Sequence, residues 1–183
     1  MKIAAINGSP KMADSTSACL IGQMEKLIGE QIETYHASRL VKGETPPETL
    51  AGILDADILL IVFPLYVDSL PAPLIELLSR LERAGHHDTA NPLVFTIANC
   101  GFFEKAQNTL ALEMIEHFAN RAGLPWGYGI GIGGGGMLSA MGKNWEKGIA
   151  SGIYRAMYDM AVAMRENKSG KNVFNDKIVA YDV

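Results

Sequence analysis

Apolar residues follow two different periods along this chain. Three short runs, at residues 3–6, 57–63 and 92–98, are almost continuously apolar, as is typical of strands buried on both faces of a parallel sheet. After the first run, apolar residues lie three and four positions apart (Leu20, Met24, Leu27), a spacing that predicts an amphipathic helix. Strand and helix alternate in this way about five times, which predicts a parallel sheet covered on both faces by right-handed crossovers.

Weaker patterns fill the intervals between these elements. Residues 31–36 form a half-polar run that fits an edge strand, 48–54 a short helix, and the leucines after Pro73 a longer helix. A further helix is expected to end near Ala122, before Gly123. Residues 126–132 alternate large side chains with glycines, which predicts a strand with one bare face, and residues 145–164 have the spacing of a final helix. We expect one domain over residues 1–183, with a tail at 170–183 that the sequence does not place.

Composition narrows the possible functions. The net charge is −4 and no block of Lys and Arg occurs, which weighs against a nucleic-acid partner. The longest apolar run, 58–67, is too short to span a bilayer, and no basic and apolar leader precedes the first strand. Two cysteines, Cys19 and Cys100, make neither a disulfide framework nor a zinc site, so no metal is expected. These features predict a cytoplasmic domain with no membrane partner.

The loop after the first strand carries groups that suit a phosphate. Because a helix begins just beyond it, unpaired backbone N–H groups at the positive end of the helix dipole should face an anion there. Gly8 and Pro10 favour a turn. The loop and the start of the helix add four hydroxyls and one positive charge, at Ser9, Ser15, Thr16, Ser17 and Lys11.

The same hydroxyls would also suit a helix start that binds no ligand, because serine and threonine gather there simply to cap helices. The loop lacks the Gly-Lys-Ser/Thr ending of a P-loop and has no G-x-G-x-x-G. A G-x-G-x-x-G does occur at Gly129, Gly131 and Gly134, but it follows the last strand instead of the first. We therefore expect a loop beside the ligand there instead of a dinucleotide fingerprint.

Two further loops leave the carboxyl ends of predicted strands, where ligands of such sheets bind. The second loop offers the ring of Tyr66 beside backbone amides of Leu65 and Val67 that we expect to be exposed, directly after Pro64. The third offers backbone around Gly101, flanked by Asn99, Cys100 and Phe102. If the three loops converge, they suit a ligand with a phosphate at one end and a flat, polar-edged ring at the other.

Over roughly residues 1–165, the chain resembles the flavodoxin-like NAD(P)H-dependent FMN reductases. The resemblance is carried by Gly8-Ser9-Pro10-Lys11 with Ser15-Thr16-Ser17, and by Pro64-Leu65-Tyr66 with Pro71-Ala72-Pro73-Leu74. It implies a flavodoxin-like, doubly wound, five-stranded parallel sheet of order 2-1-3-4-5 with helices on both faces. The chain departs from many members of this family at Ile75, where a basic residue is common. It also departs in the third loop, which is not of the Thr-Gly-Gly type.

The resemblance also implies a set of cofactor contacts. The FMN phosphate would be held by Ser9, Lys11, Ser15, Thr16 and Ser17. The isoalloxazine ring would be lined by Pro64, Leu65, Tyr66 and Val67, and by Asn99, Cys100, Gly101 and Phe102 of the third loop. Amides of residues 100–102 are where we expect a positive dipole near the ring N1.

The activity implied is hydride transfer from NADPH or NADH through FMN to a quinone, nitro-aromatic, flavin or similar small-molecule acceptor. No side-chain nucleophile is needed and no catalytic residue is assigned. A homodimer is implied because pairing of two protomers often completes the ring pocket in this family.

The alternatives are proteins of similar topology. A flavodoxin-type one-electron carrier would bind FMN without oxidising NAD(P)H, but carriers tend to display many acidic residues around the flavin. Here the second loop holds only Asp68 and the third only Glu104. A receiver-type signalling domain would need an acidic pair after the first strand and an aspartate after the third, where Asn7-Gly8-Ser9 and Pro64-Leu65-Tyr66 stand. For single residues, Cys100 is expected to be a small packing residue, and Cys19 a core residue of the first helix.

Overall fold

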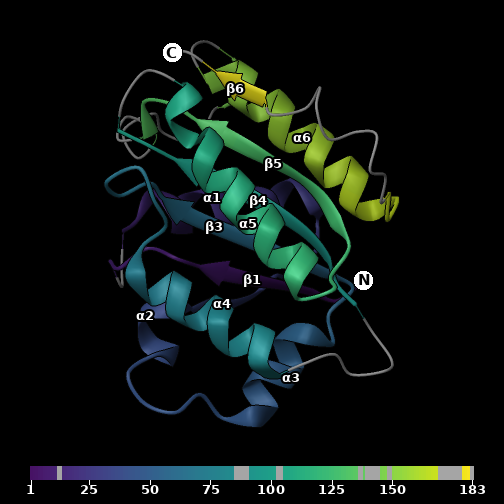
Figure 1. Cartoon of the computed structure of the whole chain (residues 1–183). Helices are drawn as coiled ribbons and strands as arrows, with labels where there is room; N and C mark the ends of the chain where they lie inside the picture. Colours follow the sequence, from purple (N-terminus) through teal and green to yellow (C-terminus); the bar gives the residue numbers. More distant parts are fainter. Residues whose placement is uncertain are drawn as a thin grey trace.

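A parallel sheet forms the centre of this computed structural model (Figure 1). The structure describes residues 1–11, 14–84, 91–101, 105–135, 138, 145–147, 150–168 and 179–181. The strands are β1 (Ile3–Asn7), β2 (Glu33–His36), β3 (Ile58–Pro64), β4 (Leu93–Asn99), β5 (Trp126–Ile132) and β6 (Val179–Tyr181). They lie in the order β2-β1-β3-β4-β5-β6, and every neighbouring pair is parallel.

The predicted order of the first five strands is confirmed, but the strand number was one too low. A sixth strand, β6, comes from the tail that the sequence did not place, and it pairs with the carboxyl half of β5. A run of only three residues has no detectable period, so its pairing depends on the open edge that β5 offers. The weakly patterned β2 does lie at the other edge, as expected.

Helices cover both faces of the sheet, because each strand returns to the next through a helix. The helices are α1 (Thr16–Ile28), α2 (Ala37–Leu40), α3 (Pro47–Leu54), α4 (Ala72–Ala84), α5 (Thr109–Arg121) and α6 (Ser151–Arg165), with a 3-10 turn, η1 (Lys105–Asn108), before α5. None of the helices in the described part of the chain has the length and apolar character that a membrane crossing requires.

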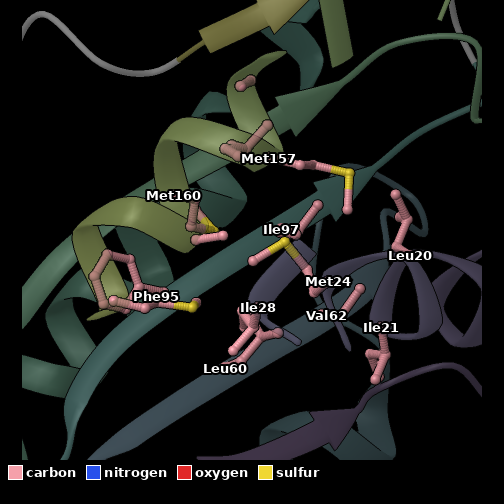
Figure 2. Close-up of a cluster of buried hydrophobic side chains, with 14 of the residues drawn as sticks. Leu20, Ile21, Met24, Ile28, Leu60, Val62, Phe95, Ile97, Met157 and Met160 are labelled. Atoms are coloured by element: carbon pink, nitrogen blue, oxygen red, sulfur yellow. The ribbon is translucent and has the colours of Figure 1, made fainter. Parts of the chain in front are cut away.

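Two apolar layers hold the helices to the sheet. On one face, Leu20 and Met24 of α1 and Met157 and Met160 of α6 pack on the side chains of β3 and β4 (Figure 2). On the other face, α3, α4 and α5 pack on the opposite side of the same strands. Both layers bury strand residues such as Leu60 and Ile61, which explains why β3 is apolar throughout.

The boundaries of α1 follow from its caps. Ser15 is the N-cap, and its hydroxyl accepts from the backbone N–H of Ala18. At the other end Gly29 adopts a left-handed conformation, with φ of 78°, and its N–H donates to the carbonyl oxygen of Glu25. The start of α1 is therefore fixed at the residue that ends the predicted phosphate loop.

Two predictions about the last third of the chain can be compared with the structure. The glycine face of β5 packs against α5: a Cβ on Gly129 would lie 2.8 Å from Leu112, so the glycine lets the helix lie close to the strand. The final helix is shorter than its spacing suggested, since α6 begins at Ser151. Trp145 is buried in the same apolar layer as α6 but lies outside the helix.

Candidate functional site

The carboxyl ends of four neighbouring strands lie at one edge of the sheet. The register pairs Asn7 with Val62, Pro64 with Asn99, and Asn99 with Ile132. Because the strands are parallel, the loops that follow these residues leave the sheet in the same direction. The strand register therefore brings the starts of the three loops to the same end of the sheet, as predicted.

Hydrogen bonds tie these loops to one another. The Leu65 N–H donates to the carbonyl oxygen of Asn99 over 2.7 Å, which joins the second loop to the end of β4. The Gly135 N–H donates to the Cys100 carbonyl over 2.7 Å, and the Thr16 hydroxyl donates to the Gly135 carbonyl over 3.3 Å. Gly135, from the loop after β5, therefore bridges the start of α1 and the third loop.

The first loop is folded by its own polar groups. The Ser9 N–H donates to the side-chain oxygen of Asn7 over 2.9 Å, an Asx turn, and the Lys11 N–H donates to the Ser9 hydroxyl over 3.2 Å. The Gly8 N–H donates to the Val62 carbonyl over 2.8 Å. A Cβ on Gly8 would lie 2.8 Å from the Cβ of Phe63, so only glycine lets the loop lie this close to β3.

Three of the four hydroxyls of this region make hydrogen bonds, two as acceptors and one as a donor. The Ser15 hydroxyl accepts from Ala18 N–H at 3.1 Å and from the Asn7 amide at 3.5 Å, and the Ser9 hydroxyl accepts from Lys11. Each of these two oxygens acts as an acceptor, so its own hydrogen remains available for donation. The Thr16 hydroxyl donates to Gly135, so its hydrogen is committed within the protein.

Ser17 differs from the other three. Its side chain lies in the first turn of α1 and is only 1% exposed, and its hydroxyl oxygen has no hydrogen-bond partner among the described residues. A buried hydroxyl without a partner costs free energy, about 1–3 kcal/mol. Because protein atoms cover this oxygen, Ser17 can serve an anion at the helix start through its backbone N–H and not through its hydroxyl as placed here.

Together these groups can bind an anion. The first N–H groups of a helix have no intrahelical acceptor, and Ser15 satisfies only that of Ala18. Ser9 and Ser15 add donor hydrogens, and the exposed side chain of Lys11 adds charge. Helix capping accounts for Ser15 but not for Ser9, which lies outside the helix and is nonetheless buried.

The second loop is a tight hairpin. Tyr66 and Ser69 exchange both backbone hydrogen bonds, at 3.0 and 3.1 Å, and the two residues between them, Val67 and Asp68, have φ of 49° and 57°. Positive φ at both central positions defines a type I′ turn, which usually takes Asn or Gly. Val67 is 98% exposed and Tyr66 is 44% exposed, so the tip presents apolar surface.

Two backbone amides that we expected to be free are occupied. The Leu65 N–H donates to Asn99, and the Cys100 N–H donates to the Ile132 carbonyl over 2.9 Å. Both amides extend the hydrogen bonding of the sheet beyond the strand ends, which sequence patterns do not reveal. The prediction that these two amides face a ligand ring is wrong, and of the third loop only Gly101 is exposed among the described residues.

The other predicted residues at the carboxyl ends of the strands differ in how deeply they are buried. Asn99 is buried and its side-chain amide donates to the Phe63 carbonyl over 2.9 Å, so it joins two strand ends. Cys100 is buried in an apolar layer and accepts from the Asn108 amide at 3.4 Å, which confirms its packing role. Cys19 was expected in the core but is exposed, because it lies on the outer side of α1. Phe102 lies outside the described residues.

Sequence reasoning missed the two residues that organise the edge. Asn7 holds the first loop and Gly135 joins it to the third, yet neither was proposed as a site residue. An asparagine that ends a buried strand and precedes Gly-Ser is a turn signal that could have been used for Asn7. Gly135 lies in the glycine-rich loop that we expected beside the ligand, but no sequence pattern distinguishes it from the neighbouring glycines.

Comparisons with known proteins identify the family of this chain. Residues 1–145 match the family model described as NADPH-dependent FMN reductase. The chain belongs to the NADPH-dependent FMN reductase family. It is accordingly an NAD(P)H-dependent oxidoreductase with FMN as cofactor, and the flavodoxin-type carrier and the receiver domain no longer apply.

Solved structures support the fold at low sequence identity. An NADH:FMN oxidoreductase in its apo form is 16% identical, covering 94% of this chain and 92% of its own, with a TM-score of 0.66. An NADPH-quinone reductase from P. pentosaceus is 15% identical, covering 88% and 98%, with a TM-score of 0.63. An NAD(P)H:quinone oxidoreductase from Methanothermobacter marburgensis is 15% identical, covering 91% and 96%, with a TM-score of 0.61. A comparison with curated protein sequences gives no match.

Proposed function

We propose that this protein transfers hydride from NADPH or NADH through FMN to a small quinone. When bound, FMN supplies the redox chemistry, and the protein supplies binding, orientation and electrostatics. The observation that carries the proposal is the pair of available hydroxyl hydrogens on Ser9 and Ser15 at the start of α1, at the same end of the sheet as the exposed ring of Tyr66.

The phosphate end would be held by the first loop and the start of α1. Ser9 and Ser15 would each donate a hydroxyl hydrogen, the backbone N–H groups of Thr16 and Ser17 would donate along the helix axis, and Lys11 would add a positive charge. In this arrangement Thr16 acts through its backbone, since its hydroxyl is turned to Gly135. Ser17 likewise acts through its backbone, since its hydroxyl oxygen is covered by protein atoms.

The ring end would lie across the carboxyl ends of β3 and β4. Tyr66 and Val67 offer exposed apolar surface to a ring face, and Gly101 offers backbone that is open to the edge, since nothing lies within 4 Å of a Cβ placed there. The remaining four predicted residues would support these groups without facing the ring themselves: Pro64, Leu65, Asn99 and Cys100. They stay in the proposed site in this supporting role.

A quinone is the acceptor that we favour among those that the sequence suggested. Two of the structural neighbours are named as quinone reductases. A quinone is flat and apolar, so it could bind beside Tyr66 and Val67 where the nicotinamide of NAD(P)H would also bind. A nitro-aromatic compound or a free flavin is flat as well, so the acceptor must be found by comparing rates. Consumption of NAD(P)H also fits the cytoplasmic location expected from the sequence.

The test is a titration followed by turnover. Purified protein is titrated with FMN by fluorescence quenching, and NADPH and menadione are then added while the nicotinamide absorbance is followed. We expect FMN to bind and NADPH to be oxidised faster with menadione than with a nitro-aromatic compound or free flavin. FMN binding without oxidation of NADPH or NADH would contradict the proposed reaction, and no FMN binding would remove the site assignment as well.

We also propose that the protein acts as a homodimer through the outer face of α4 and α5. An apolar groove of about 260 Å³ lies there, lined by Leu70, Ile75, Leu78, Ser79, Glu82, Met114, His117, Phe118 and Arg121. Ile75 is 42% exposed in this groove. The Ser69 hydroxyl contacts the Met114 sulfur at 3.8 Å, so the groove is continuous with the hairpin that carries Tyr66.

The oligomeric state can be measured by sedimentation. Ile75→Asp places a charge in the groove and should convert a dimer to a monomer, because desolvating an unpaired carboxylate is costly. Tyr158→Asp, on the exposed outer face of α6, is the matched control and should leave the dimer intact. A monomeric wild-type protein at micromolar concentration would contradict the homodimer.

A further inference from the structure

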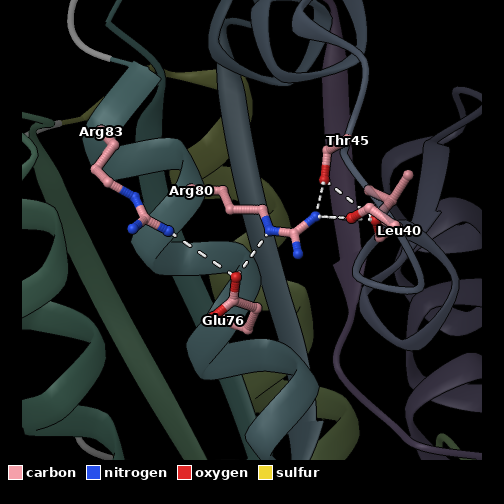
Figure 3. A network of polar contacts seen from close by, with 6 residues as sticks. Leu40, Thr45, Glu76, Arg80 and Arg83 are labelled. Carbon is pink, nitrogen blue, oxygen red and sulfur yellow. Dashed lines mark hydrogen bonds and ion pairs between the residues drawn. The ribbon is translucent and has the colours of Figure 1, made fainter.

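Arg80 of α4 joins four groups from two parts of the chain (Figure 3). Its Nε donates to the Glu76 carboxylate over 2.9 Å, one helical turn earlier. Its Nη1 donates to the Thr45 hydroxyl over 2.9 Å, to the Leu40 carbonyl over 3.4 Å and to the Gly43 carbonyl. The guanidinium therefore fastens residues 40–45, which are the end of α2 and the connection after it, to the surface of α4.

These contacts complete the end of a very short helix. α2 has only four residues, and its last carbonyl, that of Leu40, accepts from the Thr45 hydroxyl at 3.1 Å as well as from Arg80. A helix of one turn has too few internal hydrogen bonds to be stable without such partners. Arg80 and Thr45 together thus hold the carboxyl end of α2, whose first residue, Ala37, is buried in the apolar layer that also contains α4.

α2 in turn contacts the first loop. The Ser38 hydroxyl, in the middle of α2, donates to the backbone carbonyl oxygen of Ser9 over 3.3 Å. Ser9 is buried, and its hydroxyl and N–H are both fixed by neighbours in the loop. A continuous path of contacts therefore runs from Arg80 through Leu40 and Ser38 to the residue whose hydroxyl hydrogen is available to an anion.

We propose that Arg80 is a positioning residue for the phosphate loop: by fixing α2 it holds Ser38 against the Ser9 carbonyl and thereby sets the direction of the Ser9 hydroxyl. This inference rests on the proposed function, because it assigns the loop to the FMN phosphate. The side chain of Arg80 is 21% exposed and donates to three acceptors within residues 40–45, whereas that of Arg83 on the same helix is 71% exposed and, among the described residues, contacts only Glu76, at 3.9 Å. Proximity to Glu76 alone therefore does not distinguish the two arginines, but the reach to residues 40–45 does.

The test compares two ligands that differ by the phosphate. Dissociation constants for FMN and for riboflavin are measured by fluorescence quenching for wild type, Arg80→Met and the matched control Arg83→Met. We expect Arg80→Met to weaken FMN binding about tenfold while riboflavin binding changes less than about twofold, and Arg83→Met to change neither by more than about twofold. Arg80→Lys keeps a charge but not the fork of donors, and should restore FMN binding only in part.

A double-mutant cycle tests the path itself. Ser38→Ala should weaken FMN binding selectively, and adding it to Arg80→Met should cause little further loss, since both changes remove the same restraint. Additive losses would overturn the path, and equal losses for FMN and riboflavin would show a general structural role. If Arg80→Met does not fold, Ser38→Ala alone must give the selective loss, and its absence overturns the proposal. Failure of wild type to bind FMN would instead refute the proposed function.

Discussion

The loop after β1 and the hairpin after β3 stand at the same edge of the sheet but are built in opposite ways. In the first loop, Ser9 and Asn7 are buried and hydrogen-bonded within the protein. In the hairpin, Tyr66 and Val67 expose apolar groups. Both contain left-handed residues, but the first loop uses Asp14, a residue type that tolerates this conformation, whereas the hairpin uses a β-branched valine.

This difference indicates two kinds of recognition. A preorganised loop costs little to bind an anion, because its donors are already in place. A strained, exposed apolar tip costs free energy in the free protein, about 1–3 kcal/mol for such a backbone, and is tolerated where a ligand or partner covers it. We therefore expect changes to the first loop to act through charge and packing, and changes to the hairpin to act through ring contact and backbone strain.

The largest expected effect is on FMN affinity from the first loop. Lys11→Ala combined with Ser15→Ala removes a charge and a hydroxyl donor, each worth about 1.5–3 kcal/mol toward a phosphate, so FMN affinity should fall by at least about 100-fold. Riboflavin affinity should change much less. The measurement is a fluorescence titration with both ligands, and unchanged FMN affinity would mean that the phosphate binds elsewhere.

Packing beneath the same loop gives the next effect. Gly8→Ala places a Cβ at 2.8 Å from Phe63 and 2.9 Å from Leu74, so it should destabilise the fold by about 1–3 kcal/mol. Gly22→Ala is the control, because nothing lies within 4 Å of its Cβ in the interior of α1, and it should stabilise by about 0.5–1 kcal/mol. The free energy of unfolding of both variants is measured by urea denaturation. Equal changes in the two variants would contradict the close packing at Gly8.

On the hairpin, ring contact should matter more than stability. Tyr66→Ala removes an exposed aromatic side chain and should weaken FMN and riboflavin binding alike, by about tenfold, with little change in the free energy of unfolding. Tyr158→Ala on α6 has similar exposure and should leave both affinities unchanged. A loss confined to FMN would place Tyr66 near the phosphate and break the comparison.

The smallest effect concerns backbone strain at the hairpin tip. Val67→Gly should stabilise the free protein by about 1 kcal/mol, because relief of the left-handed valine exceeds the entropy cost of glycine. This corresponds to a rise of about 2–4 °C in the unfolding temperature for a chain of this size. Asp68→Gly should give almost no change, since aspartate tolerates the conformation, and thermal unfolding that shows the same shift for both would remove the strain argument.

Tertiary contacts decided how each predicted site residue acts. Leu65 and Cys100 were correctly assigned to the edge, but their amides continue the sheet instead of facing a ligand. Thr16 and Ser15 look alike in the sequence, and only the hydrogen bond from Thr16 to Gly135, 119 residues away, separates their roles. The contribution of Arg80, 40 residues from Leu40, has no sequence signal at all.

By itself, the sequence determined the alternation of strands and helices, the order of the first five strands through the resemblance of its loops, and the edge where chemistry gathers. These properties follow from local periodicity and from the fact that parallel strands end on one side. Only the tertiary structure decided the sixth strand, the commitment of each hydroxyl and amide, and the anchoring of α2, because hydrogen-bond partners distant in the chain are set by packing and not by local pattern.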